Sequence, residues 1–259
     1  CMGVSVFVGE RKLEDALSCE DVDGISIGDE LKRIGFDGVE PCGGYPITAY
    51  FEAHIEQGPI LQDEQKTIGV VRGAQGQRCF KVFITGEEGH AGTLPMDKRR
   101  DSFQAAARMA VAIDQLALKT APTSVITIGA VHVKPNSRNT IPGTTIFSID
   151  SRFPDDSVLQ SLEKSMRQIC SEIARERQVN CRFESVSYTP PVVFDERCSD
   201  AIKLASEKRE IPHMEIFSGA GHDACHISRV FPAGMIFVPC KDGVSHNEKE
   251  LATSKDLAD

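Results

Sequence analysis

Strand and helix patterns alternate over residues 73–188, and their order restricts the possible folds more than any other feature of the sequence. Strands are recognised by β-branched and aromatic residues that alternate with polar ones, and helices by apolar residues three and four positions apart. The expected elements are, in chain order, a strand at 77–87, a helix at 101–119, strands at 124–133 and 145–152, a helix that begins at Asp155 or Asp156, and a strand at 179–187. The order β-α-β-β-α-β is that of the ferredoxin-like fold. We therefore predict that this segment forms a complete small domain.

Both expected helices carry one apolar stripe, as helices that cover a core do. In the first helix the stripe consists of Phe103, Ala106, Met109, Ala110, Ile113, Leu116 and Ala117. In the second helix it consists of Leu159, Leu162, Met166, Ile169 and Ile173. We expect these stripes to be the buried faces of the two helices.

The two flanking segments, 1–72 and 189–259, differ from this middle part. Each contains a few helix and strand patterns, and neither makes a balanced domain separately. The economical interpretation is one discontinuous α/β domain. Its first part is 1–72, its second part is 189–259, and the segment 73–188 is inserted between them.

The bulk composition excludes several classes of protein. Apolar residues make up 41% of the chain and charged residues 26%, as in ordinary globular proteins, so we expect a folded chain. The formal net charge of −9 disfavours a nucleic-acid partner, because an acidic surface repels phosphate. No apolar run approaches the roughly 20 residues that cross a bilayer, so no membrane partner is expected.

The chain has nine cysteines, an odd number, and none is spaced as C-x-x-C. Scattered cysteines of this kind are typical of free thiols in a reducing compartment. The start of the sequence also lacks the basic residues and apolar run of a secretory signal. We therefore expect a cytoplasmic protein whose cysteines are structural thiols rather than disulfides or metal ligands.

Three of the seven histidines directly follow strand patterns. His54 ends an apolar strand, His90 lies in a glycine-rich turn, and His246 lies in the turn after the last strand. The ends of strands form the rim where α/β enzymes place their sites, although most single histidines are structural. A rival interpretation is a zincin-like metal site, because His222 and His226 would share one face of a helix. The residue after the first of them is an aspartate, however, and not the glutamate of that motif.

Several short motifs, spread over nearly the whole chain, occur together in a fixed order. They are HIEQGP (54–59), IGVV with GQ (68–77), GHAG-x-x-PM followed by RRD (89–101), PN-x-x-N-x-IPG (135–143), D-x-R (150–152), SGAGHDA (218–224), GMIFV (234–238) and DGVSHN-x-x-E (242–250). With these motifs the chain resembles the carbamoylase and ureidopropionase family of binuclear metal hydrolases, which includes N-carbamoyl-L-amino-acid hydrolase, β-ureidopropionase and allantoate amidohydrolase. That family belongs to the superfamily of zinc aminopeptidases and aminoacylases. The resemblance implies a metallohydrolase catalytic domain, present here in part, that is interrupted by a ferredoxin-like dimerisation or lid domain.

The resemblance also implies a site for two divalent metal ions in the full-length enzyme, with zinc, manganese, cobalt and nickel as the candidates. His54 and His246 match two metal-ligating histidines of the family, and Gln57 matches a substrate-binding glutamine. The remaining ligands and the general base of the family come from a segment that precedes the part matched by Cys1–Gly9. We therefore expect this chain to supply only part of the metal site.

Three residues of the insert match further site residues. In this family the insert forms the homodimer and reaches into the active site of the neighbouring subunit. His90 matches a histidine that stabilises the oxyanion on the ureido carbon. Arg152 matches an arginine that holds the substrate carboxylate in a bidentate fork, and Asn139 matches a substrate-binding asparagine.

The implied activity is metal-dependent hydrolysis of a non-peptide C–N bond in N-carbamoyl amino acids or related ureido acids. The ureido group would leave as ammonia and carbon dioxide. The motifs do not distinguish carbamoyl-β-alanine, carbamoyl-α-amino acids and allantoate as substrates. Because most of the expected metal ligands lie outside this chain, the alternative is a truncated or non-catalytic homologue that acts as a dimerisation or substrate-binding module.

Overall fold

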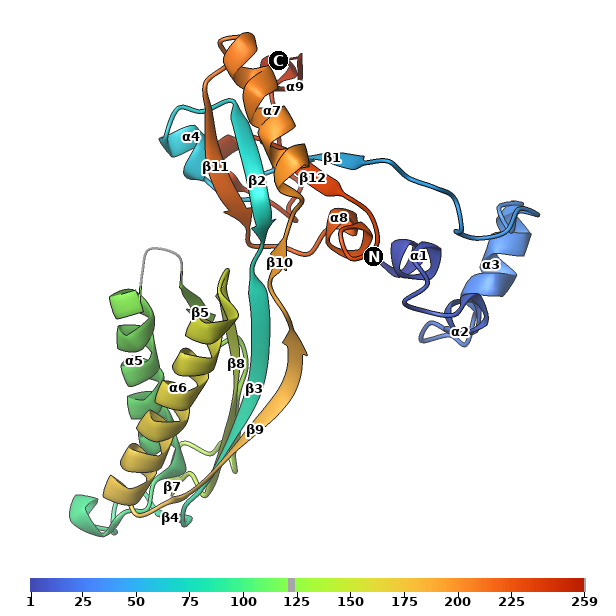
Figure 1. Cartoon of the computed structure of the whole chain (residues 1–259). Coiled ribbons are helices and arrows are strands. Elements are labelled where there is room, and N and C mark those ends of the chain that lie inside the picture. The colour runs from blue at the N-terminus through green and yellow to red at the C-terminus, as the bar shows by residue number, and fades with distance from the viewer. Residues whose placement is uncertain (121–123, 259) are drawn as a thin grey trace. The chain divides into compact units, whose positions relative to one another are not determined.

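The computed structural model describes residues 1–120 and 124–258, and the chain divides into two compact units. The first unit consists of Cys1–Ala74 and Val192–Asp259, and the second of Gln75–Pro191. Both units combine helices with β-sheet, as the predicted α/β class requires (Figure 1).

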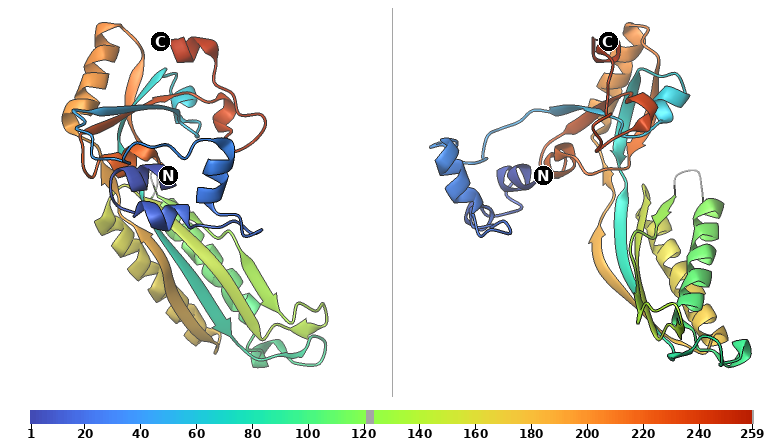
Figure 2. Two further views of the ribbon diagram at one scale, coloured as in Figure 1. Left: turned by 90° about the vertical axis from the view of Figure 1, so that its right-hand side faces the viewer. Right: turned by 180° about the vertical axis from the view of Figure 1, so that it is seen from behind.

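The second unit is built on an antiparallel sheet. Its elements are β3 (Gly76–Thr85), β4 (Gly89–His90), η1 (Met96–Lys98), α5 (Ser102–Thr120), β5 (Val125–Thr127), β6 (Val131–Lys134), β7 (Thr140–Ile141), β8 (Thr144–Phe153), α6 (Asp156–Glu176) and β9 (Asn180–Thr189). The strand order is β5-β8-β3-β9, with β6 also paired to β8, while β4 and β7 form a separate pair. The two long helices lie side by side on one face of the main sheet (Figure 2). The first strand of the unit thus lies in the centre, between β8 and β9, as in a ferredoxin-like sheet.

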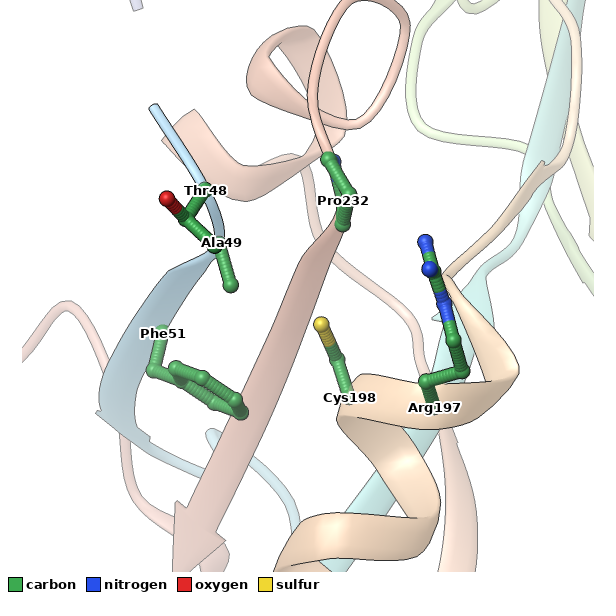
Figure 3. A pocket seen from close by; sticks show the side chains of 6 residues that line it. All are labelled: Thr48, Ala49, Phe51, Arg197, Cys198 and Pro232. Atoms are coloured by element: carbon green, nitrogen blue, oxygen red, sulfur yellow. The ribbon is translucent and has the colours of Figure 1, made fainter. Parts of the chain in front are cut away.

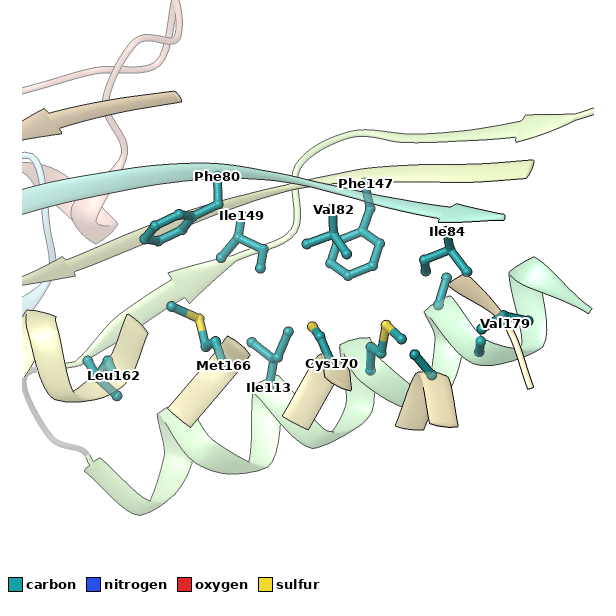
Figure 4. Close-up of a cluster of buried hydrophobic side chains, with 14 residues drawn as sticks. Phe80, Val82, Ile84, Ile113, Phe147, Ile149, Leu162, Met166, Cys170 and Val179 are labelled. Carbon is teal, nitrogen blue, oxygen red and sulfur yellow. The ribbon is translucent and has the colours of Figure 1, made fainter. Parts of the chain in front are cut away.

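Alternate residues of the two central strands form one side of the core of this unit. Phe80, Val82 and Ile84 of β3 and Phe147 and Ile149 of β8 are at most 2% exposed. Figure 4 shows these side chains facing those of α5 and α6. Because successive side chains of a strand point to opposite faces, one face of the sheet is apolar and the other is not.

The helices bury somewhat different residues from those predicted. The predicted residues that are buried are Ala106, Met109, Ile113, Leu159, Leu162 and Met166. Near the end of α6 the buried residues are Cys170 and Ala174, while Ile169 and Ile173 are only partly buried. The small side chains at these positions let the helix approach the sheet, and the isoleucines flank the contact. Phe103, in the first turn of α5, is 41% exposed.

The single strand predicted at 124–133 is wrong, because two strands, β5 and β6, occupy this segment. Both pair with β8, where Thr127 lies opposite Asp150 and Val131 lies opposite Phe147. The segment therefore advances by four residues while β8 advances by three. The Ala130 N–H donates to the hydroxyl of Ser148 (3.0 Å), which removes that donor from the strand ladder. An extra residue accommodated in this way is a β-bulge, and alternation along one strand cannot reveal it.

The first unit is built on a mixed sheet. Its elements are α1 (Met2–Phe7), α2 (Leu13–Leu17), α3 (Ile27–Ile34), β1 (Tyr50–Ile55), α4 (Ile60–Asp63), β2 (Ile68–Ala74), β10 (Val192–Val193), α7 (Glu196–Lys208), β11 (His213–Ser218), α8 (Asp223–Ile227), β12 (Ala233–Val238), η2 (Lys241–Gly243) and α9 (Ser254–Ala258). The strand order is β1-β12-β2-β10, and β11 also pairs with β2. β1 is parallel to β12, and β12 is antiparallel to β2.

Both faces of this sheet are covered. Val71 and Phe237 belong to a buried cluster with Ala224 of α8, whereas Val70 and Val238 belong to a second cluster on the α7 side. Strands that are buried on both faces read as continuous apolar runs rather than alternating ones. This explains the uninterrupted apolar sequence of β12.

All nine cysteines are free thiols, and Cys170, Cys198, Cys225 and Cys240 are buried. Within the described part of the chain, every helix falls short of the length or the apolar content that a membrane span requires.

Candidate functional site

The carboxyl ends of β1 and β12 meet at one edge of the sheet in the first unit. The two strands are parallel, and His54 of β1 lies opposite Phe237 of β12. The loop after β12 carries Ser245 and His246 to Gln57, which follows β1. Parallel strands that end together form the rim where α/β folds bind ligands. This edge therefore holds both histidines and the glutamine that the motifs single out in this unit.

The loops after β1 and β12 are packed at backbone distance. Gly243 has φ +65°, and a Cβ atom on it would lie 2.8 Å from the backbone nitrogen of Pro59. Beside this contact, the Cys240 thiol donates to the carbonyl oxygen of Gly58 (3.5 Å). Because both the left-handed backbone and the close approach require glycine, Gly243 sets the spacing between the two loops.

A buried carboxylate fixes the turn that follows β1. Glu56 is 8% exposed, and its two oxygens accept hydrogen bonds from the N–H groups of Ile60 (2.8 Å) and Leu61 (2.7 Å). These are unpaired donors at the start of α4, so the carboxylate caps that helix. Gln57, between the strand and the capped helix, is held with φ +60°.

Hydrogen bonds link the two loops around His246. The Gln57 amide donates to Ser245 Oγ (2.9 Å) and lies 3.3 Å from His246 Nε2. The Ser245 hydroxyl and the His246 backbone N–H both donate to Glu250 Oε2, at 2.8 and 3.0 Å. The Ser245 bond, followed by the His246 bond, lowers the pKa of Glu250, which is therefore an anion at neutral pH. This anion holds His246 in its left-handed conformation, φ +54°.

His54 contacts a second imidazole, that of His222, which was not predicted at this site. The ring centroids of His54 and His222 are 4.7 Å apart. His222 Nε2 lies 2.7 Å from Ser218 Oγ, and its Nδ1 lies 3.9 Å from Glu52 Oε1. Burial, followed by the repulsion that a protonated His54 would exert, lowers the pKa of His222 to about 4, so this imidazole is neutral near pH 7. The sequence could have revealed Glu52 as a neighbour of this site, because Glu52 precedes His54 by two residues and lies on the same face of β1.

The alternative metal site at His222 and His226 is wrong. α8 begins at Asp223 with His222 as its N-cap, so the two histidines do not share one helical face. His226 Nδ1 instead lies 2.6 Å from Glu10 Oε2, and the other oxygen of that carboxylate binds Arg229.

The two histidines at the rim present nitrogen atoms that suit a divalent metal. Nδ1 of His54 lies 2.8 Å from the Ile55 carbonyl oxygen, so Nδ1 carries the proton and Nε2 carries the lone pair. Nε2 of His246 faces the amide nitrogen of Gln57 and is likewise an acceptor. Among the residues that the structure describes, no group of three or more His, Cys, Asp or Glu is arranged to hold a metal ion. The two imidazoles therefore fit part of a metal site, which needs further ligands.

His90 and Asn139 lie together in the second unit. β4 pairs with β7, which places His90 opposite Thr140. The Ala91 N–H donates to the Asn139 carbonyl oxygen (3.0 Å), and the Gly92 N–H donates to His90 Nδ1 (3.1 Å). Both residues are exposed, so their side chains are accessible from outside this unit.

Arg152 forms a bidentate pair with Asp150 at the other end of β8. Its Nε and Nη2 atoms donate to the two carboxylate oxygens at 3.0 and 2.9 Å, and Gln77 donates to the same carboxylate (2.7 Å). The arginine side chain is 36% exposed. A carboxylate ligand would therefore compete with Asp150 for a guanidinium already oriented for two parallel bonds.

A long strand separates these two groups. β8 starts at Thr144, three residues after β7, and the eight steps from Thr144 to Arg152 span about 27 Å at about 3.4 Å per residue. Figure 1 shows β4 and β7 at one end of the sheet and β5, which pairs with Arg152 through Val125, at the other. The expectation that His90, Asn139 and Arg152 enter the same active site from one copy does not fit this separation, because a ureido acid is much shorter.

A hollow at the opposite end of β1 does not belong to this rim. It measures about 290 Å³ and is lined by Thr48, Ala49, Phe51, Arg197, Cys198 and Pro232 (Figure 3). Its guanidinium is already paired with Asp195 (2.8 Å), and none of the six lining side chains is a histidine or a carboxylate. The hollow therefore offers no metal donors of the kind found at the rim.

Residues 9–259 match the model of peptidase family M20/M25/M40. The chain is a member of this family. The match includes both units, so the insert and the rim of β1 and β12 are parts of one M20 chain.

Relatives of this M20 chain include named amidohydrolases. It is 42% identical over 245 residues to N-carbamoyl-L-amino-acid amidohydrolase of Rhizobium meliloti, covering 95% of this chain and 59% of the relative. It is 34% identical over 266 residues to allantoate amidohydrolase of Escherichia coli K12, covering 98% of this chain and 64% of the relative. A crystal structure of an amidase of the hydantoinase/carbamoylase family from Burkholderia multivorans superposes with a TM-score of 0.94 at 48% identity, covering 99% of this chain and 62% of that one. The resemblance predicted from the motifs is confirmed, and the chain spans about 60% of the length of the relatives it matches.

Proposed function

We propose that the full-length protein hydrolyses the C–N bond of N-carbamoyl amino acids or related ureido acids, with divalent metal ions as cofactors. One observation carries this proposal. Two imidazoles whose acceptor nitrogens suit a metal, those of His54 and His246, lie at the rim of β1 and β12 in an M20 chain. Relatives of the chain are named as hydrolases of carbamoyl amino acids and of allantoate, which supports the choice of substrate class.

The residues of the first unit would bind the metal and one side of the substrate. His54 and His246 would each supply a neutral imidazole nitrogen, and a bound divalent ion would act as a Lewis acid on the ureido carbonyl group. Gln57 would turn its amide from His246 to the substrate, because the metal would take the acceptor nitrogen that the amide now faces. Glu250 would keep His246 in place through its hydrogen bond to the backbone N–H.

The residues of the second unit would act from two copies of a homodimer that forms through the insert. Since Arg152 lies about 27 Å from the end of β8 near His90 and Asn139, each active site would take the arginine from one copy and the other pair from its partner. Arg152 would exchange Asp150 for the substrate carboxylate and keep the same two parallel bonds. His90 would stabilise the oxyanion that develops on the ureido carbon, with Asn139 beside it.

A second candidate is a non-catalytic protein that binds ureido acids or only dimerises. It is favoured by the small number of metal ligands. Among the described residues the rim offers two imidazoles, whereas a metal site needs more ligands. For both candidates we infer a cytoplasmic location, because free cysteines suit a reducing compartment.

Turnover by the full-length protein tests the choice between the two. The protein is supplied in turn with zinc, manganese, cobalt and nickel and incubated with carbamoyl-α-amino acids, carbamoyl-β-alanine and allantoate. We expect ammonia release with at least one pair of metal and substrate. His246→Ala should abolish it, whereas His132→Ala, at an exposed histidine of β6, should leave it unchanged. If the protein binds these compounds but hydrolyses none of them with any of the four metals, the result would contradict the hydrolase proposal and favour the second candidate.

A further inference from the structure

Two cysteines of the second unit face each other outside the proposed active site. Cys170 lies near the end of α6, and Cys181 is the second residue of β9. The connection between the two elements is tight. Gln178, which follows the C-cap of the helix, has φ +53°, and the Val179 N–H donates back to the Ala174 carbonyl oxygen (3.0 Å). The chain therefore reverses within a few residues, and β9 runs back along the helix, so that both cysteines border the same cavity.

Both thiols line one cavity between α6 and β9, with a volume of about 370 Å³. Cys170 is 1% exposed and lies in the apolar core, where Figure 4 labels it next to Ile113. Cys181 is partly exposed and packs against the same core. A small solute that enters the cavity can therefore reach the sulfur of Cys181 before that of Cys170.

The two thiols also influence each other, and their surroundings make them chemically unequal. The interaction with Cys170 lowers the pKa of Cys181, whereas the interaction with Cys181, together with burial, raises the pKa of Cys170. Cys181 is thus the more readily deprotonated of the two thiols. Thiolates, not thiols, are the nucleophiles in sulfur chemistry, so the more accessible cysteine is also the more reactive one.

We propose that Cys170 and Cys181 form a redox-modification site for small hydroperoxides. The Cys181 thiolate attacks one oxygen of the O–O bond, which breaks, and Cys181 becomes a sulfenic acid. The other oxygen takes up a proton from solvent and leaves as water or an alcohol. The sulfur of Cys170 then attacks the sulfenic sulfur. The S–S bond forms, and the hydroxide leaves as water with the proton of Cys170. The two cysteines lose two electrons in total, which the hydroperoxide gains, and the resulting disulfide joins α6 to β9.

Peroxide treatment of the whole chain, followed by alkylation, digestion and mass spectrometry, tests this site independently of the proposed hydrolysis. We expect a Cys170–Cys181 cross-link that dithiothreitol reverses. Cys79, on β3, is the remaining cysteine of the unit and provides the matched control. Cys79→Ser should leave the cross-link unchanged, and in the unmodified chain Cys181 should react roughly ten-fold faster than Cys79.

Two variants separate the roles of the pair. Cys170→Ala should prevent the disulfide and leave Cys181 as a sulfenic acid that dimedone traps. Cys181→Ser, at a less buried position, should remove both the cross-link and the trapped sulfenic acid from this site. Cys181 oxidation no faster than that of Cys79, or cross-links that involve Cys79 as often as Cys170, would overturn the proposal.

Discussion

A single methyl group at Gly243 should loosen the rim where His54 and His246 lie. Its φ of +65° would cost alanine about 1–2 kcal/mol relative to glycine. The new Cβ would also lie 2.8 Å from the Pro59 nitrogen and 3.0 Å from the Gly58 carbonyl carbon, so the loops must separate, at the cost of about 1–3 kcal/mol that is typical of overpacking. Alanine also restricts the unfolded chain, which offsets about 0.5 kcal/mol, so we expect a net loss of about 1.5–4.5 kcal/mol.

Gly9→Ala separates the cost of the backbone conformation from the cost of the close approach. Gly9 has φ +79°, and a Cβ atom on it would have nothing within 4 Å, so the expected loss is only about 1 kcal/mol. Urea unfolding of both variants, fitted with a separate transition for each unit, measures the two losses. Hydrogen exchange over 240–250 should show faster exchange in Gly243→Ala alone. If Gly243→Ala loses no more stability than Gly9→Ala, the loops are not in contact at backbone distance and the description of the rim is incorrect.

Three further measurements address other parts of the structure. Glu56→Gln should destabilise the first unit by about 1–3 kcal/mol in urea, because an amide cannot accept both N–H groups as a carboxylate does. The control Glu64→Gln, at an exposed position, should change stability by less than about 0.5 kcal/mol. Equal effects of the two substitutions would contradict the capping role of Glu56. Hydrogen bonding to Arg72 lowers the pKa of Glu215 from 4.5 to about 2, so its contribution to stability is present above pH 4.5 and is lost as the pH falls through about 2. The stability difference between wild type and Glu215→Gln should therefore shrink over that window, and a difference independent of pH would refute the pairing. Elemental analysis after dialysis should find fewer than two tightly held metal ions per chain, and two ions would show that ligands have been overlooked.

Local patterns predicted most of the second unit because its elements are regular. The long helices and the strands β3 and β8 each satisfy one periodicity over ten residues or more. The break between β5 and β6 was not predictable in this way, because it depends on the hydroxyl of Ser148 in another strand. The buried face of α6 was predicted only as far as Met166, since the choice between Ile169 and Cys170 depends on how closely the sheet approaches.

The candidate site was predicted only where its residues lie in short motifs. Gln57 and His246 could be paired on the strength of the motifs, and the structure places them 3.3 Å apart. The contact between His54 and His222 could not be predicted, because it depends on a loop after β11 that brings a distant segment against β1. The separation of Arg152 from His90 depends on strand order and register, which no motif encodes.

A heterodimer of two inactive variants of the full-length protein tests most directly whether two copies share each active site. Arg152→Ala removes the carboxylate clamp and His90→Ala removes the oxyanion donor, and each should lower kcat/KM for ureido acids by about 100-fold. If Arg152 and His90 of one copy serve the two different active sites of the dimer, one site of the heterodimer carries both substitutions and the other site carries neither. A heterodimer purified through two different tags should then regain about half of the wild-type activity, and a random mixture about a quarter. A heterodimer as inactive as its parents would contradict the proposed division of the site between copies.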